Sequence, residues 1–314
     1  MKSPNMKSPK LVKRFRIDDP DRFRLADFDC ADTCGLDLDK DEAKAMLAAG
    51  IARLAELQKR LYADGRWAVL IVLQGMDAAG KDGAISHVMT GLNPQGCEVR
   101  SFKAPSEEEL AHDFLWRTAI RLPERGRIGI FNRSYYEEVL VVRVHPELLE
   151  RQKLPDKLDG KEIWNHRFKS IRTFERHLAR NGVAVLKFFL NISREEQRKR
   201  LLARLDEPHK RWKFSMGDIA ERERWDEYMA AYQDMVRATS TPEAPWHVVP
   251  ADNKPFARLV MAAALIEALE ALDLEYPKIE GAALAELDKV RAALGAEGGG
   301  GKPSSKKNDQ KSKS

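Results

Sequence analysis

The sequence is poor in cysteine and has no apolar run long enough to cross a bilayer. Three cysteines in 314 residues are too few, and odd in number, to indicate a disulfide framework or a zinc site. The longest apolar helical run, residues 259–272, is interrupted by Glu267 and Glu270 and is shorter than the roughly 20 residues of a spanning helix. The first ten residues are basic but lack the apolar segment of a secretory signal. We therefore expect a cytoplasmic protein that does not act at a membrane.

The body of the chain also lacks an excess of positive charge. The whole chain has a formal net charge of +5, whereas residues 1–16 carry +6 and residues 302–314 carry +4. The part between them is therefore negative, at −5. Basic ends rich in Lys, Ser and Gly are typical of disordered segments. We expect residues 1–15 and 296–314 to be disordered, and we expect no specific nucleic-acid partner.

Between the two ends, apolar strands alternate with amphipathic helices. Strands are expected over residues 67–73, 97–102, 128–131, 183–191 and 246–250. Helices are expected over residues 39–62, 106–122, 163–181 and 256–272, and Ser106 with Glu109 predicts a capping box at the start of the second. This alternation predicts a single α/β domain over residues 16–295, with a five-stranded parallel sheet between two helical layers. In such a three-layer α/β/α fold the ligand binds at the carboxyl ends of the strands.

A glycine-rich loop follows the first strand. Residues 75–82 match the phosphate-binding pattern G-x-x-x-x-G-K, and a helix is expected to follow. The backbone expected to surround phosphate belongs to Gly75, Ala78, Ala79 and Gly80, and Lys81 would reach the phosphates as a mobile charge. Asp82 stands where Ser or Thr usually binds Mg²⁺, and Asp77 adds a second carboxylate. We expect this loop to hold metal and phosphate differently from an ordinary ATPase.

Two further polar segments follow the third and fourth strands. At the end of the third strand, Asn132 occupies the position of a conventional Mg²⁺-binding Asp, and Arg133 is a bidentate donor suited to phosphate. Residues 198–213 contain seven Lys or Arg and two acids. Such a run is commonly a solvated basic helix. In nucleoside-monophosphate-kinase-like folds, however, this position forms a lid over the phosphates, so we predict a helical lid over about residues 195–217.

Three motifs, in this order, resemble those of the family-2 polyphosphate kinases. They are Gly-x-Asp-x-x-Gly-Lys-Asp at 75–82, Asn-Arg-Ser-Tyr-Tyr-Glu at 132–137 and Asp-x-Pro-x-Lys-x-Trp-Lys-x-Ser at 206–215. The likeness covers about residues 40–275 and implies a P-loop kinase core similar to thymidylate kinases, with a helical lid. It also implies a homo-oligomer, either a dimer or a tetramer, and dependence on Mg²⁺, with Mn²⁺ as an alternative. The implied reaction transfers the terminal phosphate of inorganic polyphosphate to a nucleotide.

The resemblance assigns roles to individual residues. The catalytic positions would be Asp77, Lys81, Asp82 and Arg133. Polyphosphate would contact the glycine-rich loop together with Arg133, Arg200, Arg204, Lys210 and Lys213. The nucleotide would contact Phe102, Lys103, Asn132 and Glu137, and Mg²⁺ would bind Asp77 and Glu137. Many family members have Asp at position 132, whereas Asn132 with Glu137 resembles the subgroup that accepts AMP as well as ADP.

Other functions remain open at the level of the sequence. An ATP-dependent small-molecule or nucleoside monophosphate kinase would use the same fold, and a nucleic-acid-binding protein with a degenerate phosphate loop would use the basic ends. None of the seven histidines has the partner pattern of a phosphohistidine nucleophile, and only His209 lies in the expected lid. Transfer is therefore expected to be direct and in line, because phosphoryl transfer needs positioning and charge neutralisation more than covalent catalysis.

Overall fold

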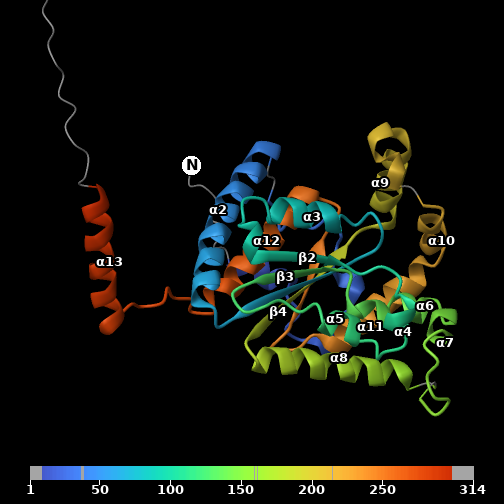
Figure 1. Ribbon diagram of the computed structural model, residues 1–314. Coiled ribbons are helices and arrows are strands. Elements are labelled where there is room, and N and C mark those ends of the chain that lie inside the picture. The colour runs from blue at the N-terminus through green and yellow to red at the C-terminus, as the bar shows by residue number, and fades with distance from the viewer. Residues whose placement is uncertain (1–8, 37–38, 159, 161, 214, 299–314) are drawn as a thin grey trace, which may run out of the picture. The chain divides into compact units, whose positions relative to one another are not determined.

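A five-stranded parallel sheet forms the centre of the protein. The structure is a computed structural model, and it describes residues 9–36, 39–158, 160, 162–213 and 215–298 (Figure 1). The strands are β1 (Ala68–Gln74), β2 (Cys97–Ser101), β3 (Ile128–Asn132), β4 (Val183–Asn191) and β5 (Trp246–Pro250). They are arranged in the order β2-β3-β1-β4-β5, and every neighbouring pair is parallel. The predicted sheet is therefore confirmed.

Strand β1 lies at the middle of the sheet and sets the position of the glycine-rich loop. All seven of its residues are buried, as expected for an apolar strand that is covered on both faces. Leu73 is in register with Asn132 of β3 and with Phe188 of β4. The carboxyl ends of the three central strands therefore meet at one edge, and the loop that begins at Gly75 leaves from that edge.

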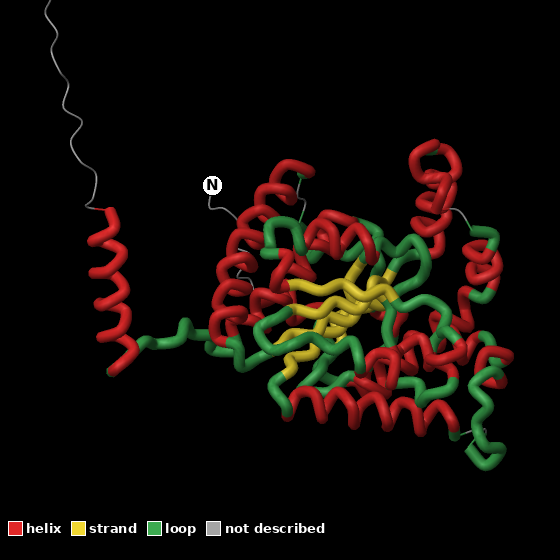
Figure 2. The backbone as a smooth tube through the Cα atoms, viewed as in Figure 1, coloured by secondary structure: helices red, strands yellow, loops and turns green. Residues whose placement is uncertain are grey.

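Helices cover both faces of the sheet. One layer contains α2 (Lys40–Asp64), α3 (Lys81–Val88) and α12 (Lys254–Glu270), and the other contains α8 (Ile163–Arg180) and α11 (Trp225–Thr239). Figures 1 and 2 show the strands between these layers, which confirms the predicted three-layer α/β/α fold. Helix α2 begins at a capping box of Asp39 and Glu42 and ends at Gly65, which adopts a left-handed conformation.

Short helices occupy several connections between strands and the segment near the N-terminus. They are η1 (Pro20–Arg22), η2 (Leu25–Asp27), η3 (Pro94–Gly96), η4 (Tyr135–Val139), α6 (Val141–Val144) and α7 (Glu147–Glu150), of which η3 directly precedes β2. The segment after β4 is helical, as predicted for the lid, and it contains α9 (Arg194–Asp206), η5 (Pro208–Lys213) and α10 (Gly217–Glu223). Its closure over a ligand stays a prediction. Among the described residues, no helix has the length and apolarity to cross a bilayer.

The prediction of a disordered N-terminus is wrong for residues 9–15. These residues form the helix α1 (Pro9–Phe15), in which Leu11 and Phe15 are buried. Phe15 packs edge-on against Phe256 of α12, with 5.9 Å between ring centroids, and Ile17 N donates to the Trp246 carbonyl of edge strand β5 at 2.8 Å. The apolar side chains therefore outweigh the basic composition. Residues 1–8 lie outside the described part of the chain.

The helix predicted over residues 106–122 is also wrong, because two short helices replace it. The expected capping box of Ser106 and Glu109 forms and opens α4 (Glu107–Leu110), and α5 (Trp116–Ala119) follows. Between them the Asp113 side chain accepts a hydrogen bond from Leu115 N at 3.0 Å. A side chain that bonds to the nearby backbone in this way competes with a continuous helix.

The body of the fold ends earlier than the predicted boundary at residue 295. The chain divides into two units, residues 1–275 and 276–314. The second unit contains α13 (Ala282–Gly298), so the predicted C-terminal disorder is wrong for residues 296–298, whereas residues 299–314 lie outside the described part. The large apolar side chains of α13 are exposed, namely Leu284, Leu287, Val290 and Leu294.

Candidate active site

The glycine-rich loop has the backbone conformation that its sequence predicts. Gly75 has φ of 152° and Gly80 has φ of 109°, both in a region that favours glycine. A Cβ atom at Gly75 would lie 2.9 Å from the Leu190 carbonyl oxygen, so no other residue fits against β4 there. Ala78, between them, adopts a left-handed conformation with φ of 62°. The loop is thus held in a tight turn between β1 and α3.

Lys81 is the first residue of α3, and its side chain folds back over the loop. The ammonium group donates to the carbonyl oxygens of Gly75 at 2.5 Å and Met76 at 3.1 Å. Burial, and next the positive charge of Arg133, lower the pKa of Lys81 to about 8, although nearby carboxylates oppose this shift. A buried ammonium whose hydrogen bonds go to neutral carbonyls is well placed to bind an anion.

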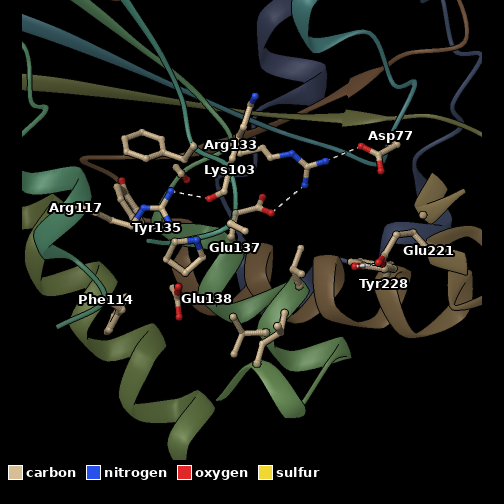
Figure 3. A pocket seen from close by; sticks show the side chains of 18 of the residues that line it. Asp77, Lys103, Phe114, Arg117, Arg133, Tyr135, Glu137, Glu138, Glu221 and Tyr228 are labelled. Carbon is tan, nitrogen blue, oxygen red and sulfur yellow. Dashed lines mark hydrogen bonds and ion pairs between the residues drawn. The ribbon is translucent and has the colours of Figure 1, made fainter. Parts of the chain in front are cut away.

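Arg133 lies between two carboxylates at the carboxyl edge of the sheet. Its guanidinium group donates to Asp77 at 2.5 Å and to Glu137 at 2.9 Å (Figure 3). The charge of Glu137, and then that of Asp77, raise the pKa of Arg133 further above its ordinary value. Its backbone has φ of 63°, which is uncommon for a non-glycine residue and costs on the order of 1–3 kcal/mol. The loop, the end of β3 and the start of η4 therefore converge on one cation.

Asn132 and Asp82 form a second link between β3 and the loop. The Asn132 amide donates to the Asp82 carboxylate at 2.7 Å. In the sequence, the acid expected at position 132 is absent and an acid is present after Lys81. In the structure the two positions are adjacent, so the carboxylate at this edge comes from the helix instead of the strand.

The carboxylates present fit a Mg²⁺ ion only when phosphate completes its coordination. The described residues contain no group of three or more His, Cys, Asp or Glu that could hold a metal. Asp77 and Glu137, the predicted ligands, share Arg133 and keep 28% and 21% of their side-chain surfaces exposed. Mg²⁺ is commonly bound through one or two carboxylates together with substrate phosphates and waters. The donor set at this edge has that composition.

Two cavities meet beside Arg133. One has a volume of about 420 Å³ and the other of about 700 Å³. Both are lined by Asp77, Phe102, Lys103 and Arg133. Arg133 and Asp77 thus stand at the junction of the two spaces.

The larger cavity is strongly basic and follows the glycine-rich loop. Its basic lining residues are Lys81, Lys103, Arg133, Arg200, Arg204, Lys210, Lys254 and Arg258. Its acidic ones are Asp77, Asp82 and Glu207. This excess of positive charge suits an extended polyanion.

The smaller cavity has a mixed lining of apolar, acidic and basic side chains, the basic ones being Lys103, Arg117, Arg133 and Arg151. Its apolar walls include Phe102, Leu110, Phe114, Val141, Val142 and Leu148, and its acids include Glu137, Glu138, Asp218 and Glu221 (Figure 3). Three predicted nucleotide-contacting residues, Phe102, Lys103 and Glu137, line this cavity, whereas Asn132 lines only the larger one. The Phe102 ring packs edge-on against Phe131 and lies under the Arg117 guanidinium group, at 5.2 Å. That ring is 8% exposed, so it is a wall of the cavity more than a free stacking surface.

The predicted lid cations are only partly directed at the larger cavity. Arg204 pairs with Asp218 of α10 at 2.8 Å, and Lys210 pairs with Glu207. The Arg200 guanidinium group is directed at backbone carbonyls and Glu196, which leaves it no N–H group for a substrate phosphate. The Lys213 side chain lies outside the described part of the structure.

Two cations of the larger cavity have no counterpart among the sequence predictions. Lys254 and Arg258 lie four residues apart at the start of α12, directly after β5. Burial, and next the charge of Arg200, lower the pKa values of both below their ordinary values. The sequence did contain a signal for them: two cations four residues apart share one helix face, and this helix follows the carboxyl end of a strand.

Comparisons with known proteins agree with this geometry. Residues 37–277 match the family model described as polyphosphate kinase 2. The chain is 53% identical over 256 residues to an ADP-polyphosphate phosphotransferase of Rhodopseudomonas palustris, covering 81% of this chain and 89% of the relative. It is 46% identical over 269 residues to an AMP/ADP-polyphosphate phosphotransferase of Meiothermus ruber, covering 86% and 97%.

A solved structure shows the same architecture. The crystal structure of polyphosphate kinase 2 from Arthrobacter aurescens TC1 superposes with a TM-score of 0.82 at 43% identity, covering 90% of this chain and 96% of that one. The predicted P-loop-kinase-like α/β fold is thereby confirmed. With a family model matched over most of its length and close relatives covered almost end to end, this chain belongs to the polyphosphate kinase 2 family.

Proposed function

We propose that this protein transfers the terminal phosphoryl group of inorganic polyphosphate to AMP and ADP, and catalyses the reverse reaction. The observation that carries the proposal is the junction of a basic and a mixed cavity at Arg133 and Asp77. A polyanion without a base suits the basic cavity, and a nucleotide suits the cavity with apolar walls. The names of the relatives from Rhodopseudomonas palustris and Meiothermus ruber support both acceptors.

In this arrangement the two substrates approach Arg133 from opposite sides. A phosphate oxygen of the nucleotide attacks the terminal phosphorus of the polyphosphate, and the bond from that phosphorus to its bridging oxygen breaks. The chain is shortened by one phosphate and the nucleotide gains it. Lys81 and Arg133 neutralise the charge on the transferred group, and no covalent enzyme intermediate is needed. The attacking phosphate is largely ionised near neutral pH, so a strong general base is unnecessary.

Mg²⁺, or Mn²⁺ in its place, completes this proposal. Asp77 and Glu137 would hold it together with substrate phosphates, and it would neutralise phosphate charge when bound. The Asp82 carboxylate accepts a hydrogen bond from Asn132, and it would help to orient the substrate phosphates on the side of the glycine-rich loop. A cytoplasmic location and a homo-oligomeric state, either dimer or tetramer, stay predictions.

The direct test supplies purified polyphosphate and ADP, with Mg²⁺ and without ATP, and measures ATP. We expect ATP to form, and with AMP as sole acceptor we expect ADP first and ATP later. Lys81→Ala should lower turnover by more than about 1,000-fold while circular dichroism still shows a folded protein, because its ammonium group neutralises charge on the transferred phosphoryl group. No ATP from the wild-type protein would overturn the proposal, and full turnover of Lys81→Ala would remove Lys81 from it. An enzyme that phosphorylates AMP only when ATP is supplied would be an ordinary nucleoside monophosphate kinase.

A further inference from the structure

Side chains of α9, the first helix of the lid segment, donate hydrogen bonds to the carbonyl groups of the glycine-rich loop. Gln197 Nε2 donates to the Asp77 carbonyl at 3.0 Å. One helical turn later, Arg200 Nη1 donates to the carbonyls of Ala78 at 3.1 Å and Ala79 at 2.9 Å. Three successive loop carbonyls thus accept hydrogen bonds from two side chains of α9.

The remaining donors of Arg200 link the loop to the segment that follows β5 and to its own helix. Nη2 donates to the carbonyls of Ala251 at 2.6 Å and Asp252 at 3.0 Å, and Nε donates to Glu196 at 2.8 Å. A guanidinium group has five N–H groups, and here five acceptors receive them. Arg200 is 8% exposed. Its charge is therefore used inside the fold.

Gln197 is 1% exposed, and both ends of its side-chain amide are hydrogen-bonded. Its Oε1 atom accepts a hydrogen bond from Arg222 of α10 at 2.8 Å, and Arg222 also donates to the Arg194 carbonyl at 2.6 Å. The amide orientation is fixed by these two contacts, because only its nitrogen can donate to Asp77. The side chain of Asp77, in turn, is paired with Arg133.

We propose that Gln197 and Arg200 are positioning residues of the phosphate-transfer site. They donate hydrogen bonds to the loop carbonyls on the side of α9. These bonds fix the positions of the loop's backbone N–H groups and of the Asp77 carboxylate at the junction of the two cavities. They act through the loop and do not touch the phosphates. The inference rests on the proposed function, and it assigns to the base of the lid segment a fixed contact with the loop.

Replacing Arg200 with Lys tests the role of the five guanidinium N–H donors separately from the role of the positive charge. Lysine keeps the positive charge but has three donors on one nitrogen, which cannot reach the carbonyls of the loop and also those of Ala251 and Asp252 after β5. We expect kcat to fall about 10- to 100-fold, with KM for polyphosphate and for ADP within about twofold of wild type. The matched control is Arg198→Lys on the same helix, an exposed residue paired with Glu195, which should behave as wild type.

Gln197→Glu is the second variant, because it keeps the size of the side chain and the acceptor for Arg222 but replaces the donor to Asp77 with an acceptor. It should give the same kcat-selective loss, and amide hydrogen exchange of residues 77–82 should become faster while that of α8 does not change. Gln197→Met also lacks the donor to the Asp77 carbonyl, but it introduces no repulsion between a carboxylate and that carbonyl. Its loss of kcat should therefore be smaller than that of Gln197→Glu.

Three results would overturn the inference. A rise of about 10-fold or more in KM for polyphosphate at unchanged kcat would make Arg200 a substrate contact. Unchanged kcat in both variants would show that the loop holds itself in place. Loss of the folded state in both variants, seen by circular dichroism, would make these residues elements of stability instead of site geometry. Absence of polyphosphate turnover in the wild-type protein would overturn the proposed function alone, since the exchange experiment still measures the loop.

Discussion

At the scale of single residues, the charge state of Lys81 is the most sensitive feature of the site. Its ammonium group is buried and bonded to the carbonyls of Gly75 and Met76, with no hydrogen bond to a carboxylate. The pKa of about 8 lies well below the ordinary 10.5. Below pH 8 the folded and unfolded forms are both protonated, and burial of the charge opposes folding; this cost disappears as pH rises from 8 to 10.5. The free protein thus tolerates a charge that a phosphate ligand would stabilise.

This pKa predicts how polyphosphate binding depends on pH. A bound anion favours the protonated lysine, so affinity should fall as pH rises above about 8, where the free enzyme loses that proton. Binding of tripolyphosphate at pH 8.5–9 (roughly the range above the shifted pKa) should therefore take up protons, measured by calorimetry in two buffers of different ionisation enthalpy. Lys81→Met should bind more weakly and take up fewer protons. Equal proton uptake by the two proteins would contradict the assignment to Lys81.

At the scale of elements, a buried ionic cluster connects β4 to α8 and η4. Lys187 and Glu175 are paired at 2.6 Å with side chains 0% and 1% exposed. The hydroxyl groups of Tyr135 and Tyr136 donate to the same Glu175 carboxylate, at 2.8 and 2.7 Å. These tyrosines lie two and three residues after Arg133 in the sequence, but both are buried in the core. They position the segment after β3 and are not free to stack on a base.

Removing one partner of this pair should be strongly destabilising. Lys187→Met leaves the Glu175 carboxylate buried without its cation, which we expect to cost about 3–5 kcal/mol of unfolding free energy. The double variant Lys187→Met with Glu175→Gln removes both charges and should recover part of that loss. Urea unfolding monitored by tryptophan fluorescence measures both values. A single variant within about 1 kcal/mol of wild type would show that the buried pair does not contribute as its geometry indicates.

At the scale of the whole molecule, the residues of both cavities belong to the first of the two units. The last cavity residue in the sequence is Arg258, and the first unit extends to residue 275. The second unit contains α13 and the basic C-terminal segment, and the family match ends at residue 277. We therefore expect truncation to separate catalysis from the C-terminal segment.

A chain ending at Glu275 should retain transfer from polyphosphate to ADP, with kcat and both KM values within about twofold of the full chain. The removed segment carries five lysines and one Asp over residues 302–314, so weak binding to nucleic acid at low salt, if the full chain has any, should decrease. Steady-state assays of both proteins and a salt titration of DNA binding provide the measurements. A loss of turnover above about tenfold would place part of the site in the second unit.

The sequence by itself was sufficient for the elements that local patterns encode. Apolar runs predicted β1 and β4, the latter interrupted by Lys187, glycines at fixed spacing predicted the phosphate loop, and the Ser106 and Glu109 pair predicted a cap. Motif order predicted the family that the comparisons confirm. These features depend on residues within a few positions of one another, or on a buried strand's need for apolar side chains on both faces, and such information is present in one dimension.

Only the tertiary structure decided which acceptors each cation pairs with. Arg200 and Arg204 are one turn apart in the same basic run, yet Arg200 donates to carbonyls of the loop and of the segment after β5, while Arg204 pairs with Asp218 on another helix. Lys254 joins the basic cavity from α12, far along the chain, and Asn132 at the end of β3 meets Asp82 of α3. A cation's role depends on which acceptors lie within about 3 Å of it. Those acceptors come from distant segments, so packing determines the role and the local sequence does not.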